Sequence, residues 1–259
     1  CGYMKAWEIS HEASIKYFLI GSLGTAFFLY GIALIYGATG TTNFTKLLPA
    51  YQAIDSASDK WLFLGGIAFL TFGLAFKGTI VPFHTWAPDV YEEASTPVVA
   101  FAAVGTKFGV FAAFIRIFLE SLPNFNFLFN ESIACLSMIT LIYANILAIR
   151  QTNLRRFFAY SGIAHAGYLL IPIAATTIES IPSILFYLTV YGTATFGAFS
   201  VLAILDKERK GLYMDDLKGL GKRSYFLSAI MILSLLTLAG IPPTAGFFAK
   251  FYIFKTGVD

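Results

Sequence analysis

Long apolar runs separated by short polar stretches dominate the chain. Seven runs approach the ~20 mostly apolar residues that an α-helix needs to cross a bilayer. They predict helices at about residues 14–37, 61–80, 95–118, 131–150, 154–177, 180–205 and 224–254. The fold class expected is therefore all-α: a polytopic bundle of about seven transmembrane helices, forming a single transmembrane domain over residues 1–259.

Prolines interrupt two of these helices beside a lysine. The segment KGTIVPFHTWAPDVYEEASTP begins at Lys77, and LAGIPPTAGFFAK ends at Lys250. Proline removes a helical hydrogen bond, and irregular backbone at membrane depth is tolerated only where protein or water surrounds it. Broken helices flank ion sites in many transporters. The proline follows the lysine in one helix and precedes it in the other, and the two helices run in opposite directions. This pattern suggests inverted repeats.

Composition supports a membrane protein. Hydrophobic residues make up 57% of the chain and charged residues 13%, with a mean hydropathy of +0.71. A soluble domain carries about 25% charged residues, so this chain has too little charge to cover a soluble surface. No lysine or arginine run is long enough to indicate a nucleic-acid partner. The expected environment is a lipid bilayer.

Three lysines remain inside apolar runs: Lys77, Lys107 and Lys250. A charge at mid-bilayer costs about 2.5–3.5 kcal/mol on insertion scales, so each needs a reason. Desolvation disfavours the charged amine, which lets a buried lysine load and release a proton. The alternative is snorkelling, in which the long side chain reaches the headgroups. It carries more weight for Lys77 and Lys250, near run ends, than for the central Lys107.

Two histidines are further candidates for a proton relay. His165 lies inside an apolar run between Tyr160 and Tyr168, and an imidazole with an unperturbed pKa of about 6.5 suits proton exchange. A neutral histidine bonded to a neighbouring helix is the equally weighted alternative. His84 follows the break at Pro82, where it would equally well face headgroup water.

Positive charges predict the orientation. One side of the membrane is expected to hold Lys5, Lys16, Arg150, Arg155, Arg156, Lys207, Arg209, Lys210, Lys218, Lys222 and Arg223. The other side is expected to hold Lys46, Lys60, Arg116 and Lys255. The positive-inside rule then places the first side, with the start of the chain, in the cytoplasm. Asp89, Glu92 and Glu93 fall on that side too. We expect them in a solvated loop, with proton uptake as the less favoured role.

Cofactor motifs are missing from the sequence. It has no Gly-rich dinucleotide fingerprint, no phosphate-binding loop and no CxxC pair for an iron–sulfur cluster. Its two cysteines, Cys1 and Cys135, are too few for a disulfide framework or a metal site. We therefore expect no metal, cofactor or redox centre in this chain. If it moves protons, the energy comes from a partner.

Four segments together resemble a known family. They are FKGTIVPFHTWAPDVY, STPVVAFAAVGTKFGVFAAFIRIF, QTNLRRFFAYSGIAHAGYLL and LAGIPPTAGFFAKFYIF. In this order they are similar to the signatures of the antiporter-like, proton-translocating membrane subunits of NADH:quinone oxidoreductase, respiratory complex I. The residues of these segments are most similar to the N type of these subunits, and the resemblance covers nearly the whole chain.

The resemblance implies a fold of about fourteen helices built from inverted repeats, with protons moving along a central polar axis. Lys77 matches the lysine of the family's first broken helix, Lys107 the connecting lysine, and Lys250 the lysine of the second broken helix. The family's glutamate on the preceding helix and its final helices have no counterpart here. We therefore expect an internal fragment of a longer chain.

The resemblance also implies partners and leaves alternatives. Quinone reduction elsewhere in the complex would drive translocation, with FMN, iron–sulfur clusters and quinone held by partner subunits. The partners would be other membrane subunits of complex I, in a bacterial cell membrane. The alternatives are a sodium/proton antiporter or membrane-hydrogenase subunit of the same superfamily, and a structural or assembly subunit whose lysines only form buried ion pairs.

Overall fold

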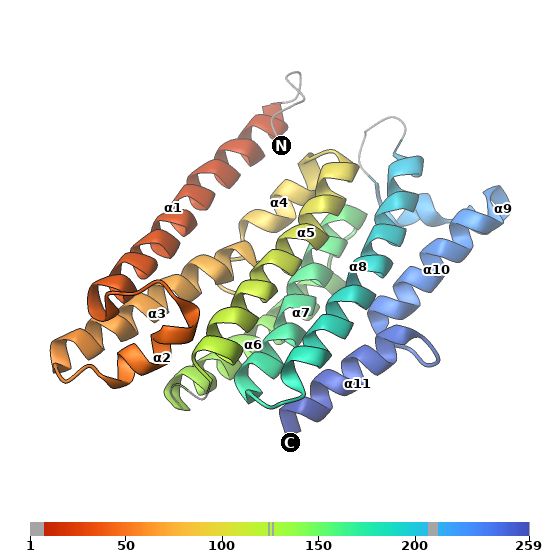
Figure 1. Ribbon diagram of the computed structural model, residues 1–259. Helices are drawn as coiled ribbons and strands as arrows, with labels where there is room; N and C mark the ends of the chain where they lie inside the picture. The colour runs from red at the N-terminus through yellow and green to blue at the C-terminus, as the bar shows by residue number, and fades with distance from the viewer. Residues whose placement is uncertain (1–7, 124, 126, 207–211, 259) are drawn as a thin grey trace.

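The computed structural model describes residues 8–123, 125, 127–206 and 212–258, and within them it forms helices and no strand beyond one isolated bridge. The long helices lie side by side with a common tilt, from α1 at one edge to α10 and α11 at the other (Figure 1). The first six helices are α1 (Glu8–Thr39), α2 (Phe44–Gln52), α3 (Ala57–Lys77), α4 (Trp86–Glu93), α5 (Thr96–Phe114) and α6 (Phe127–Ile149). They are followed by α7 (Leu154–Ala175), α8 (Ser180–Leu205), α9 (Leu220–Arg223), α10 (Tyr225–Ala239) and α11 (Ala245–Val258).

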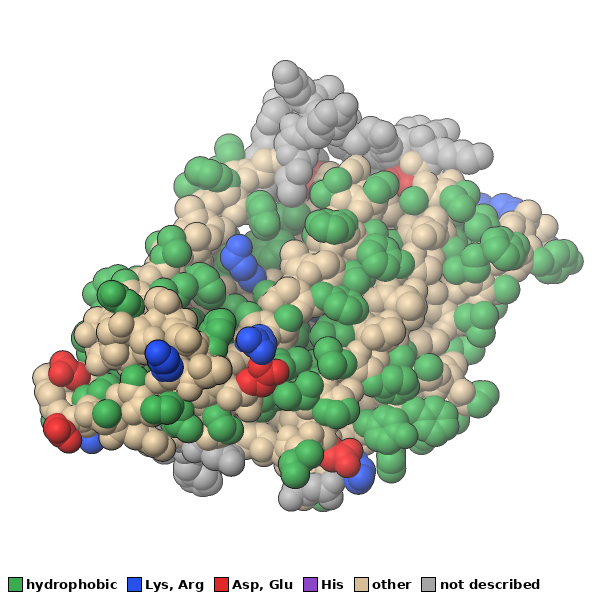
Figure 2. Space-filling view, viewed as in Figure 1, with side chains coloured by type: hydrophobic (Ala, Val, Ile, Leu, Met, Phe, Trp, Pro, Cys, Tyr) green, Lys and Arg blue, Asp and Glu red, His purple; other side chains and the backbone are tan. Residues whose placement is uncertain are grey.

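Six helices in the described ranges are long and apolar enough to cross a membrane: Ser14–Thr39, Ala57–Lys77, Thr96–Ser121, Phe129–Ile149, Leu154–Ala175 and Ser180–Leu205. They fall at the first six of the seven expected positions. Figure 2 shows hydrophobic side chains spread over one face of the molecule, with few charged ones among them. Such a face suits contact with lipid or with other membrane helices.

The first predicted break separates α3 from α4. Helix α3 ends at Lys77, and α4 begins at Trp86 after a stretch that contains Pro82. Polar groups freed by the break find partners: the indole Nε1 of Trp86 donates to the Phe76 carbonyl at 3.2 Å, and the Val81 amide donates to Thr140 Oγ1 on α6 at 3.2 Å. These bonds let irregular backbone stay inside the bundle.

The second predicted break divides the expected helix 224–254 into α10 and α11, so that no continuous helix spans this range. Gly240 ends α10 with φ +79°, and Pro242 and Pro243 cannot continue the helix. A Cβ added at Gly246 would lie 1.7 Å from the Thr237 carbonyl oxygen, so only glycine permits this approach of α11 to α10. Helix α11 also runs on to Val258.

Two of the elements that were not expected from the sequence lie together. A π-helix over Ile115–Ser121 continues α5 beyond the predicted end at residue 118. Helix α2 fills the connection between α1 and α3, where the Asn43 side chain accepts the Thr45 amide at 3.0 Å and so caps its start. Both lie at the end of the bundle where α1 ends and α3 begins.

Candidate functional site

Lys107 is the most buried charged residue of the described chain, with 1% of its surface exposed. It lies on α5, and its Nζ donates to the Thr79 hydroxyl at 3.4 Å. The same amine sits 5.7 Å from the centre of the Tyr191 ring on α8. Among the described residues, no carboxylate pairs with it. A buried amine without a counter-ion is costly, because neither water nor an anion compensates its charge.

His165 lies next to Lys107 in this interior. It is buried on α7, its Nδ1 is 2.6 Å from the Tyr187 hydroxyl, and its ring centre is 4.9 Å from that of Tyr191. Tyr191 in turn donates to the Ala103 carbonyl of α5 at 3.3 Å. Lys107 and His165 therefore share Tyr191 between them.

Lys250 joins the same region from α11. Its Nζ donates to the Ala239 carbonyl, the last of α10, at 3.0 Å and lies 4.8 Å from the Tyr168 ring centre. The Tyr168 ring is 6.1 Å from the His165 ring. Six residues on four helices thus form one polar line, which we call the central track: Lys107, Tyr191, His165, Tyr187, Tyr168 and Lys250. Helices α5, α7, α8 and α11 supply it.

The sequence candidates Lys77 and His84 lie outside the central track. Lys77, at the end of α3, is exposed and lines a cavity of about 960 Å³ together with Thr25 of α1 and Thr106 of α5. His84, in the first break, is 5% exposed, so its side chain is enclosed by the protein. Its ring packs edge-on against Tyr143 of α6 at 4.9 Å.

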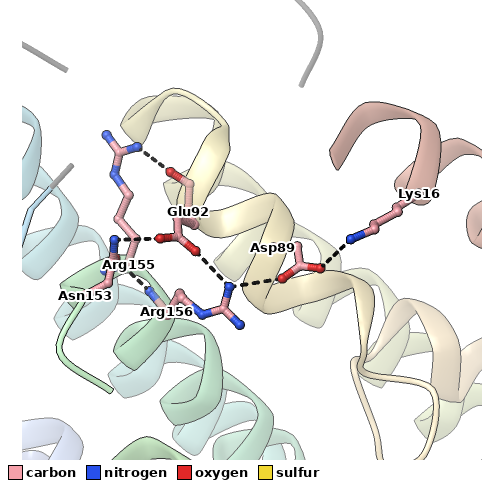
Figure 3. Close-up of polar contacts among 6 residues, drawn as sticks. All are labelled: Lys16, Asp89, Glu92, Asn153, Arg155 and Arg156. Carbon is pink, nitrogen blue, oxygen red and sulfur yellow. Dashed lines mark hydrogen bonds and ion pairs between the residues drawn. The ribbon is translucent and has the colours of Figure 1, made fainter. Parts of the chain in front are cut away.

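A cluster of paired charges lies at one end of the bundle (Figure 3). Arg156 of α7 bonds Asp89 at 3.0 Å and Glu92 at 2.8 Å, both on α4, and Lys16 of α1 reaches Asp89 at 3.3 Å. Asn153 donates to Glu92 at 3.1 Å. The loop expected at these acids is instead helix α4, and Asp89 and Glu92 are half-buried in ion pairs rather than solvated. Glu93 is the last residue of α4 and is half-buried.

Arg155 forms the buried part of this cluster. It pairs with Asp206, which follows α8, and donates to Thr96 Oγ1 at 2.7 Å and to the Ala94 carbonyl at 3.2 Å. It thereby joins the ends of α4, α5, α7 and α8. We call Lys16, Asp89, Glu92, Asn153, Arg155, Arg156 and Asp206 the terminal cluster. Sequence reasoning used these arginines only for orientation and missed their partners.

The terminal cluster bears on the predicted orientation as well. Lys16, Arg155 and Arg156 gather at one end of the bundle, as the charge pattern predicted. Lys5, Lys207, Arg209 and Lys210 lie outside the described residues. The described chain has no group of three or more His, Cys, Asp or Glu side chains that could hold a metal ion.

Comparison with known proteins gives one consistent picture. Residues 1–259 match the family profile described as NADH:quinone oxidoreductase/Mrp antiporter, TM. NADH-quinone oxidoreductase subunit N of Protochlamydia amoebophila is 58% identical over 255 residues, which cover 98% of this chain and 53% of that protein. A subunit N of Herpetosiphon aurantiacus is 42% identical, covering 96% and 52%.

Solved structures of similar fold come from the same family of membrane complexes. A chain of respiratory complex I from Thermus thermophilus has 35% identity and a TM-score of 0.79, with 95% of this chain and 52% of that chain covered. A chain of the Mrp complex from Dietzia has 25% identity and a TM-score of 0.86, covering 97% and 46%. The chain spans about half the length of the curated relatives it matches.

Proposed function

This chain belongs to the NADH:quinone oxidoreductase/Mrp antiporter transmembrane family, and from that premise we propose that it carries protons across the membrane as part of an antiporter-like subunit of NADH:quinone oxidoreductase. The similarity to subunit N over 98% of the chain supports this choice within the family. The proposed path is the central track. Because the relatives are about twice as long, the complete path belongs to the full-length protein.

The buried, uncompensated amine of Lys107 is the observation that carries the proposal. An arginine would keep its charge in this position, whereas a desolvated lysine can shed it by giving up a proton. Ionisable residues inside a membrane commonly mark proton relays. In the proposed path Lys107 takes up a proton, His165 exchanges it, and Lys250 passes it on beyond α11.

Water completes the proposed path. Proton transfer needs hydrogen-bond contact or one bridging water, and the rings of the central track separate Lys107, His165 and Lys250 by more than direct contact. The hydroxyls of Tyr187 and Tyr191 would hold such waters in place. Lys77, in its cavity beside α1, and His84, in the first break, are the proposed outer members of the relay.

The rest of the complex would supply energy and redox chemistry. In this proposal FMN, iron–sulfur clusters and quinone lie in partner subunits, and quinone reduction there drives the charge changes along the track. Residues 1–259 would form one part of a transmembrane domain of about fourteen helices with inverted repeats. The end of the bundle that carries the terminal cluster would face the cytoplasm of a bacterium.

Sodium/proton antiport is the second candidate function. It is favoured by the high structural similarity to a chain of the Mrp complex. The two functions separate when the reconstituted full-length protein is assayed in its complex: antiport requires a sodium gradient, whereas the proposed function requires NADH and quinone. A purely structural role fits less well, because Lys107 forms no ion pair within the described part of the chain.

The test replaces Lys107 by methionine, a side chain of similar length without the amine. The full-length Lys107→Met protein, assembled in its complex and placed in lipid vesicles, should lose proton translocation by at least about tenfold, since relay groups typically contribute that much or more. Complex assembly on native gels should stay normal. Lys60→Met, at an exposed lysine of α3, is the matched control and should translocate normally. Normal translocation by Lys107→Met would overturn the proposal, and failed assembly would favour the structural role.

A further inference from the structure

We propose that Thr79, in the break between α3 and α4, is a positioning residue that holds the protonated amine of Lys107 and so couples this break to the proton on Lys107. The proposal rests on the proposed function, because it assumes that Lys107 gains and loses a proton. The sequence pattern did not single out Thr79.

The backbone of Thr79 is held in an unusual conformation. Its φ is +60°, a left-handed conformation that β-branched residues rarely adopt. Such strain persists only where the surroundings hold it, and it often marks functional sites. Thr79 is 2% exposed, and its amide donates to the Phe76 carbonyl at 3.2 Å while the Ile80 amide donates to Ala75 at 2.9 Å. The break thus fixes a strained residue directly against Lys107.

The hydroxyl of Thr79 is arranged to accept from the amine. Its single proton is donated to the Gly78 carbonyl at 2.6 Å, so only lone pairs remain for Lys107, whose Nζ lies 3.4 Å away. A hydrogen bond from a charged donor is stronger than one from a neutral donor. The Tyr191 ring face, 5.7 Å from the same amine, also attracts a cation. Both contacts therefore favour the protonated state of Lys107.

The same stretch of backbone is anchored on its other side to α6. The Val81 amide donates to Thr140 Oγ1 at 3.2 Å. Two residues of the break, Thr79 and Val81, thus bond to two different helices, α5 and α6. When Lys107 loses its proton, its hydrogen bond to Thr79 weakens. The strained backbone of Thr79 is then held in place by one strong interaction fewer. The break between α3 and α4 is then the element that responds to the charge on Lys107.

Other titratable groups around Lys107 are the same in every variant tested. The Tyr191 phenol faces it from α8, and the His165 imidazole lies beyond that ring on α7. Within the described structure the hydrogen bonds of these two groups go to other partners than Thr79: Tyr191 donates to Ala103, and His165 bonds Tyr187. A change at Thr79 therefore reports on its own contact with the amine.

The first experiment records proton translocation against pH for the full-length Thr79→Val protein in its complex. Valine keeps the branched shape and removes the hydroxyl acceptor. The protonated amine then loses a partner, so the alkaline limb of the profile should move down by about one pH unit, as expected for one charge-assisted hydrogen bond. Thr79→Ser keeps the hydroxyl and should restore the normal limb. Thr71→Val is the matched control, because Thr71 is also buried, on α3, but its hydroxyl donates to the Ile67 carbonyl of its own helix.

A second variant covers the case in which Thr79→Val fails to assemble. Thr79→Gly also removes the hydroxyl but relieves the left-handed strain, so it should assemble at least as well as the parent and show the same downward shift. A parent-like profile in Thr79→Val or Thr79→Gly would overturn the inference. The proposed function is tested separately. Normal translocation by Lys107→Met would overturn the proposed function. Lost translocation in Lys107→Met together with an unshifted pH profile in Thr79→Gly would leave the proposed function standing and overturn only the role of Thr79.

Discussion

Asp89, Glu92 and Asp206 in the terminal cluster each meet an arginine. Along the central track, Lys107 and Lys250 meet a hydroxyl, a carbonyl and the faces of two rings. Burial alone does not separate the two regions, since Arg155 is 6% exposed and Lys107 is 1% exposed. Pairing does.

The difference in pairing implies a difference in role. A buried ion pair fixes both charges, because removing one partner leaves the other uncompensated. A buried amine without a counter-ion can lower its free energy by releasing its proton. The terminal cluster is therefore expected to hold helices together, and the central track to change its charge during turnover. Substitutions in each region test whether the two roles differ.

The largest expected effect is at Arg155. Arg155→Met leaves Asp206 buried without a counter-ion and removes the bonds to Ala94 and Thr96, which should cost about 3–5 kcal/mol of the free energy of unfolding. Thermal unfolding of the purified complex measures it. The double variant Arg155→Met with Asp206→Leu should recover part of the loss, because no charge is left unpaired. An unchanged unfolding midpoint in the single variant would show that the cluster does not hold the helices.

A smaller effect is expected at Tyr187 in the central track. Tyr187→Phe removes the hydroxyl 2.6 Å from His165 Nδ1 and leaves that nitrogen buried without its partner. The expected cost is about 1–2 kcal/mol of stability, with slower proton translocation. Tyr252→Phe is the control, on the exposed side of α11. If both variants behave alike, the His165–Tyr187 bond has no part in the track.

The smallest effect is expected at the Arg116–Glu120 pair, whose side chains are 60% and 41% exposed. Glu120→Gln should change the free energy of unfolding by no more than about 0.5 kcal/mol, because solvent screens exposed ion pairs. The same unfolding assay measures it. A cost close to that of Arg155→Met would mean that an exposed ion pair stabilises this protein as much as the buried Arg155–Asp206 pair, so the terminal cluster would have no special part in holding the helices.

The breaks and the burial of Lys107 could be predicted from the sequence, because proline and lysine are conspicuous inside apolar runs. Lys77, chosen by the same reasoning, is exposed at the end of α3. Pro82, Pro242 and Pro243 lie where the helices break, and Lys107 is the most buried charged residue of the described chain. Local spacing carries this information.

The terminal cluster could not be predicted in the same way. Arg156 and Asp89 are 67 positions apart, and Arg155 and Asp206 are 51 apart, so only the packing of α4, α7 and α8 brings them together. Tyr191 lies between Lys107 and His165, and Tyr187 bonds His165; in the sequence both stand inside an apolar run. Helices that are apolar on all sides give no pattern that says which face points inward, so Tyr187 and Tyr191 could not be selected from their neighbours.

The most direct test of the contrast measures proton translocation and thermal unfolding together for Lys107→Met and Arg155→Met, each in the full-length protein within its complex. The two variants should behave in opposite ways. Lys107→Met should keep the parental unfolding midpoint and lose translocation, and Arg155→Met should lose several degrees of unfolding midpoint. A Lys107→Met protein that unfolds early yet still translocates protons at the parental rate would show that Lys107 stabilises the fold and carries no proton.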